Sequence, residues 1–266
     1  MPTILDLEPP PGCVVRFISD LHLTHKRSTA PPPAELVKQM NGINMLVLCG
    51  DTTEMRLNET LRAQSMAARD ELRELCSARG IELIEIAGNH DPDEGPMLAR
   101  FWGGRVLAMH GHALLKEVSP WSREYLEHKE ALRPIISKYS EKESDLTESL
   151  EHARSIAREL ARYTASPRPK RPRNALQELR HCFWPPERPL LIVWNWLTYA
   201  AKAERWMRRC QPNAEVLIFG HFHRAGRWKY GKRLLFNTGA WFEHASPYAV
   251  DMQDAHVLRH FPLSSL

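Results

Sequence analysis

Five segments of the sequence contain residue types that bind metal ions in proteins. In chain order they are Asp20-Leu21-His22, Gly50-Asp51, Gly88-Asn89-His90-Asp91, His110-Gly111-His112 and Gly220-His221-Phe222-His223. Their carboxylate, amide and imidazole groups, with no thiolate among them, suit Mn²⁺, Zn²⁺ or iron ions that also bind water. The residue types therefore predict a metal centre.

The number of candidate ligands favours two ions over one. The candidates are Asp20, His22, Asp51, Asn89, His110, His221 and His223. This set and a water exceed what one ion binds, whereas they suit two ions that share a carboxylate. Two ions about 3.5–4 Å apart lower the pKa of a bridging water and bind the attacking and leaving oxygens at phosphorus. The pattern therefore predicts hydrolysis of phosphate esters.

The spacing within two of the segments has a mechanical reason. Residues i and i+2 of an extended chain point to the same side, so Asp20 and His22 are expected to direct two ligands at one point. The same argument applies to His221 and His223. Gly50, Gly88 and Gly220 each come directly before a candidate ligand. Glycine at these positions lets the backbone turn sharply and lets the neighbouring chain approach the metals.

Secondary structure must bring these segments together, and an apolar run precedes each of them. The runs cover residues 14–19, 45–50, 83–88, 106–109 and 216–220. Runs of this length, rich in Val, Ile and Leu, are typical of strands buried on both faces in α/β sheets. Open α/β folds collect functional groups at the carboxyl ends of such strands. We therefore expect the five segments to meet at one edge.

Helix and strand signals between and after these runs complete the expected core. A helix is predicted over 58–79, with Asn58 as its N-cap and Gly80 at its end. Three short strands are expected near the C-terminus, at 233–236, 248–250 and 256–258. Turn residues separate them, which predicts an antiparallel ending.

Residues 113–212 interrupt this alternation and are predicted to form an inserted helical cap on a core of residues 1–112 and 213–266. Apolar residues at steps of three and four over 146–160 indicate an amphipathic helix. The basic, proline-rich run 168–173 is expected to be an extended loop. Residues 113–210 carry 19 basic and 13 acidic side chains. Their aromatic residues either form the core of the cap or contact acyl chains.

Composition excludes several other classes of protein. The 266 residues are 43% hydrophobic and 26% charged, which is ordinary for a globular domain and excludes a disordered, collagen-like or coiled-coil chain. A net charge of +4 permits an anionic partner without requiring one. Five cysteines without close pairs argue against a disulfide framework or a cysteine zinc site. No signal peptide is recognisable, and the apolar run 190–201 is too short to span a bilayer, so we expect a cytoplasmic protein.

The five ligand segments, in this order, resemble the signature motifs of the calcineurin-like metallophosphoesterases over residues 1–112 and 213–240. The resemblance implies an α/β fold, namely a β-sandwich of two mixed sheets flanked by helices, with a dinuclear metal centre at the strand ends. It implies that one metal binds Asp20, His22, Asp51 and His223, and that the other binds Asp51, Asn89, His110 and His221. It also implies that His90 protonates the leaving group or stabilises the transferred phosphoryl group.

Within this superfamily the layout is most similar to the UDP-2,3-diacylglucosamine hydrolases of lipid A synthesis. The similarity rests on the helical insertion, on Glu54 shortly after Gly-Asp, and on the Gly-Ala-Trp of residues 239–241. That branch usually has arginine where this chain has His90, and aspartate where it has His112. The resemblance implies a UDP-linked acyl sugar as substrate, and it leaves a phosphomonoester or a nucleotide or nucleic-acid phosphodiester open.

Together these observations predict a phosphoesterase that works by metal-bound hydroxide with two divalent cations. Mn²⁺ is the metal expected first, and Zn²⁺ or iron are the alternatives. His112 and Asp91 are expected to contact substrate or to support the ligands, and Glu54 is expected to be structural. The expected partner is a phosphorylated small molecule or a lipid-linked substrate, with peripheral contact between the cap and the inner membrane face. Nucleic acid is a weaker alternative, and a non-catalytic scaffold is the alternative from another class.

Overall fold

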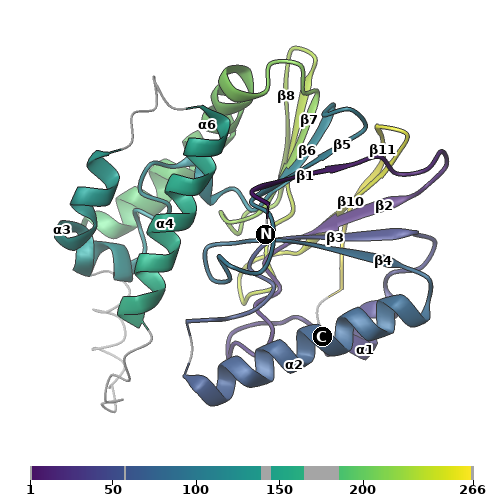
Figure 1. Cartoon of the computed structure of the whole chain (residues 1–266), viewed down its shortest axis with the longest axis horizontal. Helices are drawn as coiled ribbons and strands as arrows, with labels where there is room; N and C mark the ends of the chain where they lie inside the picture. The colour runs from purple at the N-terminus through teal and green to yellow at the C-terminus, as the bar shows by residue number, and fades with distance from the viewer. Residues whose placement is uncertain (1, 57, 139–144, 165–185, 265–266) are drawn as a thin grey trace.

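A computed structural model describes residues 2–56, 58–138, 145–164 and 186–264 of the chain. Two β-sheets lie face to face, and helices lie along the outer side of each sheet (Figure 1). Strand pairing within each sheet is partly parallel and partly antiparallel. The predicted α/β fold, a β-sandwich of two mixed sheets flanked by helices, is therefore confirmed.

One sheet has six strands, three of which run parallel beside one another. In spatial order they are β1 (Ile4–Leu7), β5 (Leu98–Phe101), β6 (Val106–Met109), β7 (Val216–Phe219), β9 (Arg233–Asn237) and β8 (Gly226–Tyr230). β6, β7 and β9 are mutually parallel, whereas β5 and β8 are antiparallel to β6 and β9. The antiparallel ending expected for the C-terminal strands is therefore wrong for one side of β9, because β9 pairs antiparallel with β8 but parallel with β7.

The other sheet has five strands, three of which are also parallel. In spatial order they are β11 (His256–Pro262), β10 (Tyr248–Gln253), β2 (Val15–Ile18), β3 (Met45–Cys49) and β4 (Glu82–Ile86). β2, β3 and β4 are parallel, and β10 is antiparallel to β2 and β11, as expected for the chain end. β2 and β3 are fully buried as predicted, but β4 is only partly buried because it forms the sheet edge.

Aromatic and aliphatic side chains fill the space between the two sheets. Phe17 of β2 and Phe101 of β5 meet edge to face, with ring centroids 5.3 Å apart. Both are fully buried, and complete burial of such a side chain stabilises a fold by about 1.5–3 kcal/mol. Val47 and Ile218 belong to the same core. This core fixes the sheets against each other and therefore fixes the strand ends that carry the ligand segments.

Two helices cover the outer face of the five-stranded sheet, α1 (Pro33–Lys38) and α2 (Glu59–Ala78). Leu72 of α2 packs in one buried cluster with Leu46 and Leu48 of β3. The predicted helix over 58–79 is confirmed, because the Asn58 side chain accepts a hydrogen bond from the backbone N–H of Leu61 at 3.0 Å. Gly80 follows the helix with φ +68°, a conformation that glycine adopts without strain.

The described part of the chain between β6 and β7 forms helices on the outer side of the six-stranded sheet (Figure 1). They are η1 (His112–Leu114), α3 (Arg123–Ser137), α4 (Leu146–Thr164) and α6 (Glu187–Cys210). The amphipathic helix predicted over 146–160 is confirmed as part of α4. The basic run 168–173 lies outside the described residues. In the described part of the chain, no helix is long and apolar enough to cross a membrane.

These helices share one hydrophobic core with the sheet that they cover. Leu160 of α4 and Tyr199 of α6 are buried in the same cluster as Leu217 and Phe219 of β7. The division into a core and an inserted cap of residues 113–212 stays a proposal. The shared core indicates that the insertion and the sheet stabilise each other.

Candidate metal centre

The loops after β2, β3, β4, β6 and β7 carry all seven predicted ligands, and the structure brings these side chains together. They are Asp20, His22, Asp51, Asn89, His110, His221 and His223. Six of them are buried, and the His223 side chain is 37% exposed. Because β2, β3 and β4 are parallel in one sheet and β6 and β7 in the other, both sheets contribute ligands from strand carboxyl ends.

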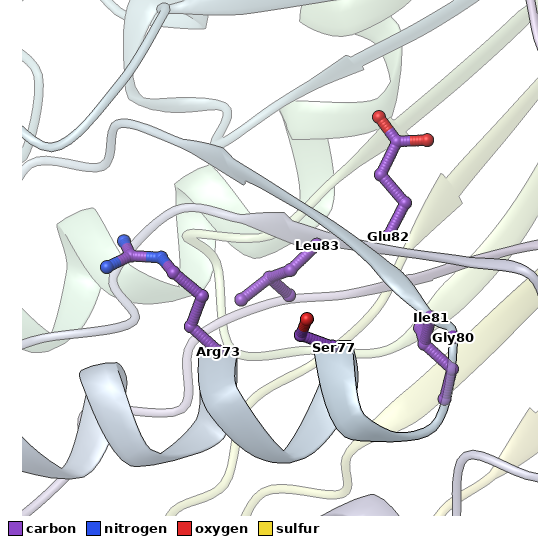
Figure 2. Close-up of a pocket in the computed structure, with 6 residues that line it drawn as sticks. All are labelled: Arg73, Ser77, Gly80, Ile81, Glu82 and Leu83. Atoms are coloured by element: carbon purple, nitrogen blue, oxygen red, sulfur yellow. The ribbon is translucent and has the colours of Figure 1, made fainter.

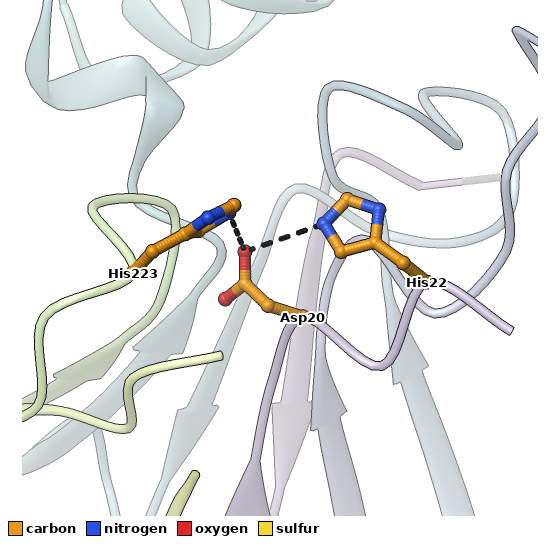
Figure 3. Close-up of side chains that lie close together, drawn as sticks. All are labelled: Asp20, His22 and His223. Carbon is orange, nitrogen blue, oxygen red and sulfur yellow. Dashed lines mark ion pairs between the residues drawn. The ribbon is translucent and has the colours of Figure 1, made fainter. Parts of the chain in front are cut away.

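One group of donor atoms surrounds Asp20 (Figure 3). Asp20 Oδ1 lies 3.2 Å from His223 Nε2 and 3.9 Å from His22 Nε2. His22 Nε2 also lies 3.7 Å from Asp51 Oδ2. In the described part of the chain this buried nitrogen has no hydrogen-bond partner. A buried nitrogen that faces two carboxylates without a partner fits a site for a cation between them.

A second group of donor atoms surrounds Asp51. His110 Nε2 lies 3.2 Å from Asp51 Oδ2, 3.0 Å from Asn89 Oδ1 and 3.2 Å from His221 Nδ1. The Asp51 carboxylate thus faces both this group and His22 of the first group. A bridging carboxylate between two cations needs this placement. The ligand roles of these residues stay predictions that the donor arrangement supports.

Hydrogen bonds outside the centre fix which imidazole nitrogen faces inward. His110 Nδ1 lies 3.1 Å from the carbonyl oxygen of Cys49, so Nδ1–H donates there and Nε2 faces Asp51. His221 Nε2 lies 2.9 Å from the carbonyl oxygen of Val118, which leaves Nδ1 toward His110. Carbonyl partners of this kind orient metal-binding histidines. Burial lowers the pKa of His110, but the charges of Asp51 and Asp20 outweigh it and raise that pKa to about 9.

Five of the seven candidate ligands have a strained backbone conformation, and the extended geometry expected for the i, i+2 pairs is wrong. Asp20, His22, Asp51, His221 and His223 have φ values of 54°, 45°, 51°, 72° and 52°. This left-handed region is uncommon outside glycine and costs about 1–3 kcal/mol per residue. The paired ligands therefore point inward because the backbone turns tightly at each of them. They do not depend on the alternation of side chains along an extended strand. Such strain concentrates at functional sites.

Asp91, predicted to contact substrate or support the ligands, connects two of the ligand loops through backbone hydrogen bonds. Its carboxylate accepts hydrogen bonds from the N–H groups of Asp51, Thr52, Thr53 and Gly88 at 2.7–3.0 Å. Burial and the charge of Asp51 raise the pKa of Asp91 to about 7, although the N–H groups of Thr53 and Gly88 act against this shift. At 1% exposure Asp91 supports the loops and has no open side for substrate.

Glu54 is the residue that sequence reasoning assigned only a structural role. The structure places its buried carboxylate between two imidazoles: Oε1 lies 2.6 Å from His90 Nδ1, and Oε2 lies 3.2 Å from His22 Nδ1. Burial raises the pKa of Glu54, but the charge of His90 and the hydrogen bonds of both histidines hold it well below its ordinary value. The available signal was its position three residues after Asp51.

His90 lies on the open side of the centre. Its side chain is 27% exposed, and Nε2 lies 3.9 Å from Asp51 Oδ2. Because Glu54 accepts a hydrogen bond from Nδ1–H, the other ring nitrogen, Nε2, faces the metal centre. His112 is 1% exposed, and in the described residues neither of its ring nitrogens has a hydrogen-bond partner. Its ring centroid lies 5.4 Å from that of His110.

A hollow of about 270 Å³ lies elsewhere, where the end of α2 meets β4 (Figure 2). Arg73 and Glu82 are its ionisable lining residues, and Arg73 is ion-paired with Asp70 and Glu85. This hollow gathers no set of metal-binding groups. The chemistry that the sequence predicts therefore belongs to the strand ends.

Comparison with known proteins agrees with this fold. A sequence model of the Calcineurin-like phosphoesterase superfamily domain matches residues 14–252. The chain therefore belongs to the calcineurin-like phosphoesterase superfamily. Members of this superfamily depend on two metal ions, and the described residues include candidate ligands for them. A search of curated proteins gave no match.

Several solved structures are similar to this chain at low sequence identity. A Vps29 single mutant from Entamoeba histolytica is 13% identical, with 94% of this chain and 99% of that chain covered and a TM-score of 0.44. A predicted phosphoesterase from Streptococcus pneumoniae TIGR4 is 13% identical, with 96% and 100% covered and a TM-score of 0.37. A dimetal phosphatase from Danio rerio is 12% identical, with 97% and 100% covered and a TM-score of 0.39.

Proposed function

We propose that this protein is a hydrolase that cleaves a phosphate ester or diphosphate bond with two divalent cations, Mn²⁺ being the expected metal. The observation that carries the proposal is the Asp51 carboxylate, which lies between two groups of donor atoms. The buried His22 Nε2, which has no hydrogen-bond partner in the part of the chain that the structure describes, supports a cation in the first group. The inward Nε2 of His110 supports a cation in the second group.

Two cations bound here would supply Lewis acidity at phosphorus and a water of lowered pKa. Asp20, His22 and His223 would hold one cation, and Asn89, His110 and His221 the other, with Asp51 shared between them. The buried ligands and their carbonyl partners hold the donor atoms in place before metal arrives, so little rearrangement is needed. The part of the centre that stays open is the side of His90 and His223.

In this proposal His90 is the general acid. Glu54 holds Nδ1–H, so a proton on Nε2 can pass to the oxygen of the leaving group. A proton supplied at the leaving oxygen avoids the release of an alkoxide, and such catalysis contributes about 10²–10⁴ in rate.

For the substrate we propose a UDP-linked acyl sugar. The Gly-Ala-Trp segment on which this assignment rests lies against the centre, because the Trp241 N–H donates to the Asp20 carbonyl oxygen at 3.2 Å. Exposed apolar side chains on α6 supply a surface for acyl chains or a membrane. Leu190, Trp194 and Leu197, spaced four and three residues apart, are 72%, 62% and 71% exposed. Phosphomonoesters and nucleotide or nucleic-acid phosphodiesters are the alternative substrates.

One panel of assays tests the proposal. The protein is supplied with Mn²⁺ and offered a phosphomonoester, a cyclic nucleotide, single-stranded DNA and a UDP-linked acyl sugar. We expect hydrolysis of the UDP-linked acyl sugar above the other three. Preference for DNA or the cyclic nucleotide would overturn the substrate, and a metal-loaded protein inactive on all four would favour a scaffold.

Two variants test the roles within the centre. Asp51→Ala should remove both metals, because the shared charge is lost. His90→Ala should keep both metals and lower kcat by about 10²–10⁴. Metal analysis and steady-state kinetics on one preparation separate these outcomes, and a His90 variant as fast as the parent would refute the assigned role.

A further inference from the structure

Arg56 is a buried cation beside the centre that the proposed reaction has not yet used. It lies two residues after Glu54 and is 9% exposed. Its Nη2 donates to the carbonyl oxygen of Asn89. Among the described residues, its buried Nε has no hydrogen-bond partner, and no carboxylate forms an ion pair with the guanidinium. A buried guanidinium with so few partners is costly, because burial removes its hydration.

His112 presents a second polar group without partners in the same region. Both of its ring nitrogens are buried and unpartnered in the described residues. Arg56 lies close enough to His112 for its charge to act on the ring. An imidazole carries at least one N–H donor whether it is neutral or protonated. Two donors left without acceptors, one of them charged, indicate that an anion completes this region.

We propose that Arg56 binds a non-bridging phosphate oxygen of the substrate, with His112 N–H as a second donor, and that it selects substrates whose phosphate groups carry two negative charges. The proposal rests on the proposed function, since it assigns a further residue to the same site. The backbone carbonyl oxygen of Asn89, a candidate ligand residue, accepts from Nη2, so the guanidinium lies beside the candidate metal centre. A guanidinium and a phosphate form charge-assisted hydrogen bonds.

The charge of the site supports this substrate class. Asp20 and Asp51 are the two carboxylates among the candidate ligands, so their two negative charges would be set against two divalent cations and the Arg56 guanidinium. Glu54 is occupied by the two histidines that it contacts. The loaded centre would thus keep net positive charge, which favours a phosphomonoester dianion or a diphosphate over a singly charged phosphodiester. A UDP-linked sugar, with two charges on its diphosphate, belongs to the favoured class.

The test compares Arg56→Met with the parent on a matched pair of substrates. p-Nitrophenyl phosphate and bis(p-nitrophenyl) phosphate share a leaving group and differ in charge at pH 8. For the variant we expect kcat/KM to fall by about 10- to 100-fold on the monoester and by less than about threefold on the diester. Arg56→Lys should recover part of the loss. Arg133→Met on α3, an exposed arginine paired with Glu130, serves as the control and should change neither value.

Binding of inorganic phosphate to the Mn²⁺-loaded protein, measured by calorimetry, gives a readout that does not depend on turnover. We expect Arg56→Met to weaken it about tenfold or more at unchanged metal content. Equal phosphate affinity in the two fully loaded proteins would overturn the inference. Loss of metal with Arg56→Met, and normal phosphate affinity once metal is restored, would also overturn it, because Arg56 would then only position Asn89. Arg56-dependent phosphate binding without hydrolysis of any ester would refute the proposed function and leave the anion subsite standing.

Discussion

Glu54 contacts two imidazoles that have different roles in the proposed reaction. One carboxylate oxygen lies 3.2 Å from Nδ1 of the candidate ligand His22, and the other lies 2.6 Å from Nδ1 of His90. Glutamine has the same shape, but it carries no charge. Its amide keeps one oxygen as an acceptor for one histidine and presents an N–H₂ group to the other histidine, which needs an acceptor there. One ring would therefore turn or change its tautomer.

We expect Glu54→Gln to lower kcat by about 10- to 100-fold, the usual loss when a group that orients metal-site histidines is removed. KM should change little, since Glu54 has no open side toward substrate. Glu54→Asp keeps the charge and should retain more activity than Glu54→Gln. Glu35→Gln, an exposed carboxylate on α1, is the matched control. If kcat were the same in the parent and in both Glu54 variants, the positioning role would be wrong.

At the scale of the elements, the loops after β3 and β4 pack so closely that only glycine fits at position 88. A Cβ on Gly88 would collide with the Asp51 carboxylate and backbone nitrogen, and would lie 2.8 Å from Asp91 Oδ1. Gly88→Ala must therefore push the two loops apart. We expect the free energy of unfolding to fall by about 1–3 kcal/mol, measured by urea denaturation, and metal affinity to fall as well.

Gly231→Ala is the control that distinguishes the effect of a steric collision from the effect of backbone strain. Gly231 has φ +58° in the turn between β8 and β9, and a Cβ there would meet nothing within 4 Å. This variant should lose some stability through strain but should bind metal as the parent does. If Gly88→Ala bound metal as tightly as the parent, the prediction would be wrong, because metal binding would not depend on the close packing of the two loops.

α6 allows a prediction about lipid contact. Leu190, Trp194 and Leu197 form an exposed apolar face on its N-terminal half. Replacing all three with serine should reduce association with anionic vesicles, and turnover of an acylated substrate, by about tenfold or more. Turnover of a small chromogenic phosphodiester should stay unchanged, as it should in Leu258→Ser on β11, which alters an exposed leucine outside α6. Equal loss on both substrates would indicate that the face serves folding.

The sequence was sufficient to predict the central strands and helix α2, because long apolar runs and capping residues are local signals. β1, β5, β8 and α3 were not predicted. β1 and β8 are short, partly exposed strands at the sheet edges. β1 depends on β5, a partner distant in sequence, whereas β8 pairs with the adjacent β9 and carries no apolar run that would predict a strand. α3 contains Pro134, which weakens a helical pattern.

The same distinction explains the candidate site. The order of the motifs was sufficient to predict that the seven candidate ligands lie together, because each motif follows a recognisable strand. The roles of Glu54 and Arg56 depend on how the loop after β3 folds against His90 and Asn89, about 35 residues later. Left-handed φ values, which direct the paired ligands, also arise from tertiary packing. Contacts between loops are therefore the part that periodicity and spacing did not predict.

At the scale of the whole molecule, the candidate centre joins the two sheets. Asp20, His22, Asp51 and Asn89 follow strands of the five-stranded sheet, whereas His110, His221 and His223 follow strands of the six-stranded sheet. A cation between them binds the folded chain and not the unfolded one. Metal binding must therefore stabilise the sandwich as a unit.

Without metal, proton binding at His110 replaces part of this stabilisation. Its pKa is raised from 6.5 to about 9, so the folded protein holds this proton more tightly than the unfolded chain. The resulting stability is present below pH 6.5 and is lost as pH rises toward 9. A bound cation needs the same Nε2 unprotonated, so metal competes with the proton and binds more weakly as pH falls.

Removal of metal with a chelator should therefore lower Tm, and the loss should be larger at pH 9 than at pH 6.5. At a metal concentration 100 times Kd, each site adds about 2.7 kcal/mol. For a chain of this size that corresponds to roughly 5–10 °C per site. Thermal unfolding with Mn²⁺ and with a chelator, at both pH values, measures the difference. Asp51→Ala should show no metal-dependent shift at either pH, because it removes the carboxylate that both donor groups face; a shift equal to the parent's would place the cations away from the junction of the sheets.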